Sequence, residues 1–114
     1  MVMVPYIPQR GDIVWINFTP QMGREQAGKR PALVISPFDY NKKVGLALFC
    51  PITSHAKGYP FEVNIPEGSK INGVVLTDQL KSLDFKIRKI QFVCKLSSVT
   101  MQEVLSKINT LLGS

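Results

Sequence analysis

Apolar residues occur in short runs, and the shortness of these runs limits the chain to a fold built mainly from short strands. The runs are separated by turn residues, with 8 glycines and 8 prolines in 114 residues. Two further stretches, residues 61–65 and 83–88, alternate apolar and polar side chains, which is the period of a half-exposed strand. Strands and helices do not alternate along the chain, so the pattern predicts a small, mostly β barrel. The strand-length runs are residues 13–18, 32–35, 46–50, 74–76 and 90–93.

Two segments carry helix signals. Ser36-Pro37 offers a capping hydroxyl followed by proline at the first helical position, and Gly45 stops the short helix that these residues begin. Residues 100–103 (TMQE) form a capping box with Thr100 as the cap, and an apolar stripe follows over residues 104–112. We therefore expect one domain, residues 1–114, with a short helix inside the barrel sequence and an amphipathic helix at the C-terminus.

Charge and cysteine usage indicate the partner and the compartment. The net charge of +6 and the pI near 9.6 suit a polyanionic partner such as nucleic acid. Cys50 and Cys94 are far apart inside apolar runs, which is typical of buried free thiols in a reducing compartment rather than of a metal site. The N-terminus lacks a signal-peptide pattern, and no apolar run approaches the ~20 residues that span a membrane. These observations predict a cytoplasmic protein without a membrane partner.

The segment between the first two predicted strands is the strongest candidate for chemistry. Residues 23–31 carry one carboxylate and three cations together with two glycines, which is a composition suited to handling a phosphate. Similar polar clusters follow other predicted strands, and strand ends on one rim of a barrel could bring them together. The clusters are Glu25 with Lys29 and Arg30, Thr53-Ser54 with Lys57, and Asp78-Gln79 with Lys81.

Several kinds of catalytic site are missing from the sequence. There is no P-loop, and a single histidine, His55, excludes an acid–base pair made of two histidines. Too few ligand-type residues occur at metal spacing for a two-metal nuclease. RNA cleavage needs less, because the 2′-OH of the substrate is the nucleophile. A base, a proton donor and cations that stabilise the phosphorus centre are sufficient. Arg30 suits the last role, because its fork can hold two phosphate oxygens.

Five segments in order along the chain resemble the signature segments of the MazF/PemK toxins. The resemblance implies an SH3-like barrel of CcdB/MazF type, a two-fold homodimer and no metal or other cofactor. It further implies a sequence-specific endoribonuclease that cleaves single-stranded RNA to 2′,3′-cyclic phosphate and 5′-OH ends, and that a cognate antitoxin neutralises. We expect that antitoxin to contribute an acidic, partly disordered segment. The five segments are residues 11–15 (GDIVW), 23–31 (GREQAGKRP), 51–54 (PITS), 57–61 (KGYPF) and 78–79 (DQ).

The resemblance also implies roles for particular residues. Arg30 and Thr53 match the catalytic pair of the family, and Glu25 matches its acidic residue, which is the candidate base. His55 is interpreted as a solvated bystander and stands outside the catalytic set. Lys29 occupies a position that is His in some relatives. The candidate RNA-binding residues are Lys29, Lys57, Gln79, Lys81, Phe18 and Ser54.

Two other functions remain open at the level of sequence. The first is a CcdB-like gyrase poison, which shares this barrel but acts without chemistry through C-terminal residues that include an aromatic one; this chain ends LLGS. The second is an SH3-like binding module, which would bind its ligand with a steep salt dependence and leave it intact.

Overall fold

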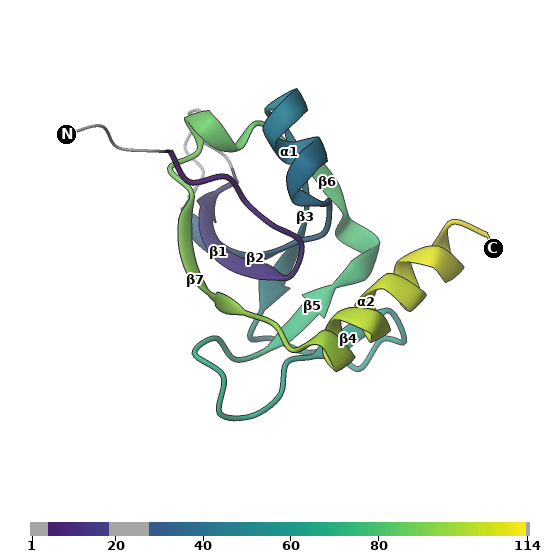
Figure 1. Cartoon of the computed structure of the whole chain (residues 1–114). Coiled ribbons are helices and arrows are strands. Elements are labelled where there is room, and N and C mark those ends of the chain that lie inside the picture. Colours follow the sequence, from purple (N-terminus) through teal and green to yellow (C-terminus); the bar gives the residue numbers. More distant parts are fainter. Residues whose placement is uncertain (1–4, 19–27, 114) are drawn as a thin grey trace.

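A computed structural model describes residues 5–18 and 28–113 of the chain (Figure 1). Within these ranges the chain is mostly β, as predicted, with two helices and two short 3-10 turns. The strands are β1 (Asp12–Asn17), β2 (Lys29–Val34), β3 (Ala47–Thr53), β4 (Glu62–Asn64), β5 (Val74–Leu76), β6 (Lys81–Leu83) and β7 (Gln91–Lys95). The helices are α1 (Phe38–Val44) and α2 (Ser98–Leu111), and the turns are η1 (Thr77–Gln79) and η2 (Phe85–Ile87).

All strand pairs are antiparallel, and β3 is the strand on which the sheet is organised. The order is β4-β5-β3-β2-β1-β7, and β6 also pairs with β3. One edge of β3 pairs with β2, while its other edge pairs first with β6 (Phe49 opposite Lys81) and then with β5 (Thr53 opposite Val74). This division of one edge between two partners lets the sheet curl around its core (Figure 1).

Two apolar clusters fill the molecule, and strands β1 and β2 contribute to both. Ile13 and Leu33 belong to the cluster that α2 covers, whereas Val14 and Ala32 belong to the cluster that Phe49 and Phe85 fill. Successive side chains of a strand point to opposite faces, so a strand buried on both faces is apolar without alternation. The continuous apolar runs of these strands therefore reflect burial on both sides.

Helix α2 is amphipathic as predicted, but it begins earlier than the capping box indicated. Ser97, not Thr100, is the N-cap, and its side chain accepts a hydrogen bond from the Thr100 N–H at 3.3 Å. Thr100 itself is buried with Met101, Val104 and Ile108 on the core face. The serine hydroxyl satisfies one of the unpaired N–H groups of the first turn, so the helix can start one turn earlier.

Ser36 does not cap α1, although Gly45 ends this helix as predicted, with a φ of +82°. The Ser36 hydroxyl instead bonds to the Oδ1 atom of Asn41 at 2.5 Å and accepts from the Leu48 N–H at 2.8 Å. Asn41 is fully buried and donates to the carbonyl of Pro8 at 2.8 Å. The polar residues at the start of α1 therefore form a buried junction between the N-terminal segment, α1 and β3.

The two strands next to the candidate site, β2 and β3, are longer than predicted, because each continues through a proline. Pro31 lies within β2, opposite Trp15, and Pro51 lies within β3, opposite Ala32. Arg30 is consequently a strand residue rather than a loop residue. The alternating stretch 83–88 is also not a continuous strand, because β6 ends at Leu83 and η2 follows.

Candidate active site

Two cavities meet at the C-terminal end of β3, and Thr53 and His55 line both of them. The larger cavity, which we call the β5 cavity, measures about 520 Å³, and the second, the Arg30 cavity, measures about 430 Å³. The β5 cavity is lined by Thr53, His55, Lys57, Tyr59, Phe61, Glu62, Leu76, Asp78 and Gln79. The Arg30 cavity is lined by Trp15, Arg30, Pro31, Ile52, Thr53, Ser54, His55, Lys70, Ile71 and Asn72.

Arg30 and Thr53, the predicted catalytic pair, line one cavity from neighbouring strands. The register between β2 and β3 pairs Ala32 with Pro51, so the same register continued by two residues sets Arg30 opposite Thr53. Arg30 is exposed, and its guanidinium forms no hydrogen bond or ion pair within the described ranges. An uncommitted guanidinium next to a hydroxyl can bind an anionic oxygen through charge-assisted hydrogen bonds.

Gly73 fixes the backbone of Thr53 from the neighbouring strand. It directly precedes β5, has a φ of +126°, and lies so close to β3 that a Cβ atom here would be 2.2 Å from the Thr53 carbonyl oxygen. Its own carbonyl accepts from the Ile65 N–H at 3.0 Å. Only glycine combines this backbone conformation with this approach. The end of β3, and with it the Thr53 hydroxyl, is therefore held against the start of β5.

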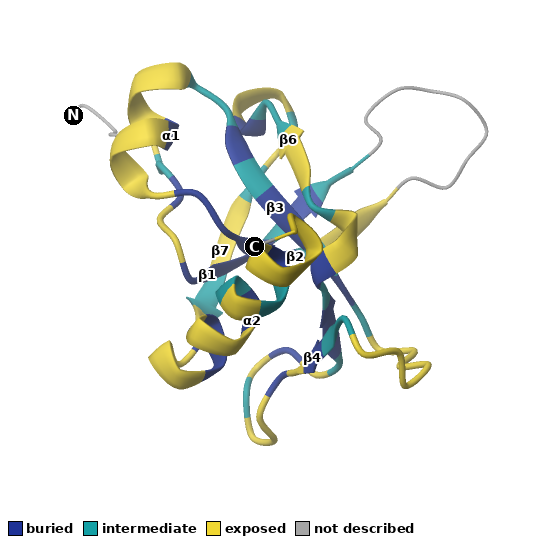
Figure 2. Ribbon diagram, turned by 90° about the vertical axis from the view of Figure 1, so that its right-hand side faces the viewer, coloured by how far each residue is buried: buried dark blue, intermediate teal, exposed yellow. Residues whose placement is uncertain are grey.

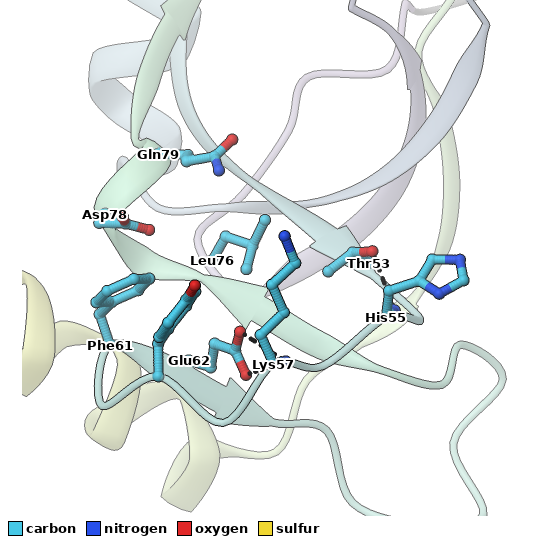
Figure 3. Close-up of a pocket in the computed structure, with 9 residues that line it drawn as sticks. Thr53, His55, Lys57, Phe61, Glu62, Leu76, Asp78 and Gln79 are labelled. Carbon is cyan, nitrogen blue, oxygen red and sulfur yellow. Dashed lines mark hydrogen bonds between the residues drawn. The ribbon is translucent and has the colours of Figure 1, made fainter.

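The β5 cavity presents a cation, an amide and two carboxylates above an apolar floor (Figure 3). The Lys57 ammonium group is directed into the cavity between Leu76 and Thr53, while Asp78 and Gln79 border it from η1. Tyr59 and Phe61 stack with ring centroids 5.3 Å apart. Flat aromatic and apolar surface beside hydrogen-bonding groups is the combination that accommodates an unstacked base.

Glu62 organises the loop that carries Lys57. Its carboxylate accepts hydrogen bonds from the backbone N–H groups of Lys57, at 3.1 and 3.2 Å, and of Gly58, at 3.1 Å. On the other side of the loop, the Lys107 ammonium donates to the Pro60 carbonyl. These bonds occupy the carboxylate, so Glu62 holds the loop in place rather than standing open to a substrate.

The other predicted site residues lie outside these two cavities or outside the described residues. Lys29 donates to Gln91 Oε1 at 3.3 Å, and Lys81 lies 5.5 Å from the ring centroid of Phe18. Neither pair lines the Arg30 cavity or the β5 cavity. Glu25, the candidate base, belongs to residues 19–27, which are not described. The structure thus brings Arg30, Thr53 and Ser54 together, and Thr53 with Lys57 and Gln79.

Sequence reasoning missed several residues of the cavities, including Lys70, Trp15 and His55. Trp15, which lies in the predicted strand at residues 13–18, packs partly against the core and also lines the Arg30 cavity. Lys70 also lines the Arg30 cavity, but nothing in the sequence around it indicated a functional site. His55 did carry one signal in the sequence, because it lies only two residues from Thr53. In the structure, its backbone N–H donates to the Thr53 hydroxyl oxygen at 3.1 Å.

Cys50 lies behind the site, and burial raises the pKa of its thiol to about 12, with a further contribution from the charge of Asp78. A thiol with this pKa is about 10⁻⁴ thiolate at pH 8, and only the thiolate reacts. Cys94 is partly exposed. We expect a thiol reagent at pH 8 to modify at most one cysteine per native chain quickly, and both after denaturation. Fast modification of two thiols in the native protein would contradict this placement of Cys50.

The described residues lack two features that would point to other functions. Among residues 5–18 and 28–113, no three or more His, Cys, Asp and Glu side chains are grouped so that they could hold a metal ion. In the same ranges, neither helix has both the length and the apolar character that crossing a membrane requires.

Comparison with known proteins gives consistent matches along most of the chain. A family model described as the PemK-like, MazF-like toxin of type II toxin–antitoxin systems matches residues 9–112. Over 108 residues the chain is 44% identical to the endoribonuclease toxin MazF of Escherichia coli (strain K12), covering 95% of this chain and 96% of that protein.

Solved structures agree in fold. A crystal structure of MazF from Deinococcus radiodurans has a TM-score of 0.87 at 48% identity and covers 96% of this chain and 100% of that chain. A MazE–MazF structure from the same organism has a TM-score of 0.85 at 44% identity, covering 96% and 98%. The predicted barrel of CcdB/MazF type is thereby confirmed.

Proposed function

We propose a cleavage mechanism for this chain, which belongs to the PemK-like, MazF-like toxin family of type II toxin–antitoxin systems. The chain is therefore an endoribonuclease. The activity is metal-independent and sequence-specific, and it acts on single-stranded RNA. The observation that carries the proposal is the shared cavity of Arg30 and Thr53 at the ends of β2 and β3. A gyrase poison or a plain binding module is not favoured, because the curated relatives at this level of identity are named endoribonucleases.

Three groups of the chain take part in the attack on the phosphorus. Glu25 accepts the proton of the 2′-OH, whose oxygen attacks the adjacent phosphorus. Arg30 donates to the phosphate oxygens, on which negative charge develops, and Thr53 positions the scissile phosphate by a hydrogen bond from its hydroxyl. Fixed donors aimed at a developing charge are commonly the largest contribution to catalysis, and the exposed Arg30 guanidinium, which has no hydrogen-bond partner among residues 5–18 and 28–113, is suited to that role. The products carry a 2′,3′-cyclic phosphate and a 5′-OH.

The RNA strand follows the two cavities. Ser54 and Thr53 contact the scissile phosphate region, and Lys57 and Gln79 contact the neighbouring nucleotide in the β5 cavity. Lys29 and the Lys81–Phe18 pair extend this surface, with cations for the backbone and a ring on which a base can stack. The net charge of +6 supports binding of a polyanion along this path.

The family also supports a proposal for the assembly and the cellular setting of the toxin. Solved relatives include MazE–MazF structures, so we propose a cognate antitoxin whose acidic, partly disordered segment folds onto the basic surface and blocks it. The chain acts as a homodimer in the cytoplasm, where messenger RNA is present, and residues 1–114 form a single toxin domain. The two free thiols are compatible with a reducing compartment.

The deciding experiment maps the ends of RNA fragments that the purified protein produces in excess chelator. We expect cleavage at a defined sequence, with 2′,3′-cyclic phosphate and 5′-OH ends, because the nucleophile belongs to the substrate. An oligonucleotide of the same sequence with one 2′-deoxyribose at the scissile position is the control, and it should remain intact. A requirement for a divalent ion, or cleavage of the deoxy control, would contradict the mechanism.

A further inference from the structure

The proposed reaction lacks one group, which is the donor that protonates the leaving 5′-oxygen. Without a donor, the P–O5′ bond must break to give a free alkoxide, which is a poor leaving group in water. A positioned acid typically supplies 10²–10⁴-fold in rate. Histidine is the side-chain type that gives and takes a proton close to neutral pH, whereas lysine and arginine ordinarily keep theirs.

His55 lines the same cavity as the proposed catalytic pair, which is where that donor has to act. It is the single histidine of the chain, its side chain is exposed, and it lines the Arg30 cavity together with Arg30 and Thr53. Figure 3 shows its imidazole directed away from the β5 cavity, whose space Lys57 enters. Within the described residues, the only hydrogen bond of His55 is the one from its backbone N–H to Thr53, so its ring is not committed elsewhere.

The other charged groups at the two cavities do not offer an equivalent proton. Arg30 and Lys70 share the Arg30 cavity with His55, and Lys57, Glu62 and Asp78 border the β5 cavity. Glu62 is occupied by backbone N–H groups. The three cations attract the phosphate next to the histidine, and an imidazolium there would add to that attraction.

We infer that His55 is the general acid of the cleavage reaction, an assignment that rests on the proposed function. The 2′-oxygen forms a bond to phosphorus as its proton passes to the base. The P–O5′ bond breaks, and the 5′-oxygen takes the proton from the His55 imidazolium. One proton enters and one leaves the protein, so the RNA is rearranged without water or an oxidant. Before the next turnover, the neutral imidazole that is left takes up a proton from solvent and the base releases one.

The test uses two RNAs with the sequence found by end-mapping. One is ordinary RNA, and the other carries sulfur in place of the bridging 5′-oxygen at the scissile position, because a thiolate leaves without a proton. We expect His55→Gln to lower the turnover rate on ordinary RNA by about 10²-fold or more. On the 5′-thio RNA the same variant should cleave within a few-fold of the wild-type rate.

Two other variants separate acid catalysis from loss of charge. Lys70→Gln removes a cation from the same cavity, and Arg30→Ala removes the proposed phosphate ligand; each should lower the rates on both RNAs by the same factor. Because His55 is exposed, His55→Gln should leave the circular-dichroism spectrum unchanged. Near wild-type turnover of His55→Gln on ordinary RNA, or an equal loss on both RNAs, would overturn the assignment. Wild-type protein that leaves ordinary RNA intact would overturn the proposed function itself.

Discussion

Arg30→Ala is expected to lower the turnover rate by about 10²–10³-fold, which is the usual cost of removing one donor to a developing oxyanion. RNA binding should weaken only modestly, because the other cations of the surface still hold the phosphate backbone. Arg30 is an exposed residue of β2, so the substitution removes no core contact and should leave stability nearly unchanged. Single-turnover rates with saturating protein, compared with binding of an uncleavable 2′-deoxy oligonucleotide, separate the two effects.

Arg30→Lys is the matched variant for this prediction. It keeps the positive charge but loses the planar fork that can hold two phosphate oxygens, so it should recover only part of the rate. Full activity of Arg30→Lys would assign Arg30 a purely electrostatic role. A change in binding as large as the change in turnover would contradict the proposed stabilisation of the transition state.

Gly73→Ala is expected to impair both stability and turnover. Its backbone has a φ of +126°, and the added Cβ would lie 2.2 Å from the Thr53 carbonyl oxygen and 2.8 Å from the Thr53 carbonyl carbon, so β3 and β5 must separate. A displacement near 1 Å at a catalytic group can cost about 10²-fold in rate. Thermal unfolding and single-turnover cleavage of the folded fraction measure the two consequences.

Gly68→Ala is the control, because Gly68 also has a positive φ, of +90°, but has open space where a Cβ would point. It bears the conformational cost, of order 1–3 kcal/mol, without displacing Thr53, and it should therefore keep its turnover rate. In a Thr53→Ala background, Gly73→Ala should lower turnover little further, because the two changes act through the same hydroxyl. Equal turnover losses in Gly73→Ala and Gly68→Ala would rule out a specific contact with Thr53.

The two cavities bring polar clusters that are separate in the sequence next to one another in space. Thr53 lines both, so a phosphate bound next to Arg30 is adjacent to the cavity that Lys57 and Gln79 border. A strand of RNA that crosses the end of β3 would meet the catalytic pair and the groups suited to base contact in succession. Sequence specificity and cleavage can therefore be coupled through the residues that belong to both cavities, Thr53 and His55.

Burial shows where the sequence was informative (Figure 2). The short apolar runs led to the correct fold class, because a strand of five residues with turns on each side has few ways to be buried. The apolar stripe at the C-terminus correctly predicted α2, because a helix with one apolar face buries that face against the core. The predicted ends of some elements were wrong where a residue could serve two different structural roles. Ser36 offered a capping hydroxyl, but Asn41 and the Leu48 N–H took it. The prolines 31 and 51 suggested strand ends, but both lie inside strands.

The sequence by itself determined the mostly β architecture and the basic charge, which follow from periodicity and composition, and its resemblance to the MazF/PemK toxins implied Arg30 and Thr53 as a candidate pair. Only the tertiary structure decided that Arg30 lies on a strand beside Thr53, that Gly73 holds the backbone of Thr53, and that His55 reaches the same cavity. The physical reason is that these contacts are made across neighbouring strands. Residues about 20 positions apart meet only through the register of the sheet, which no local pattern encodes.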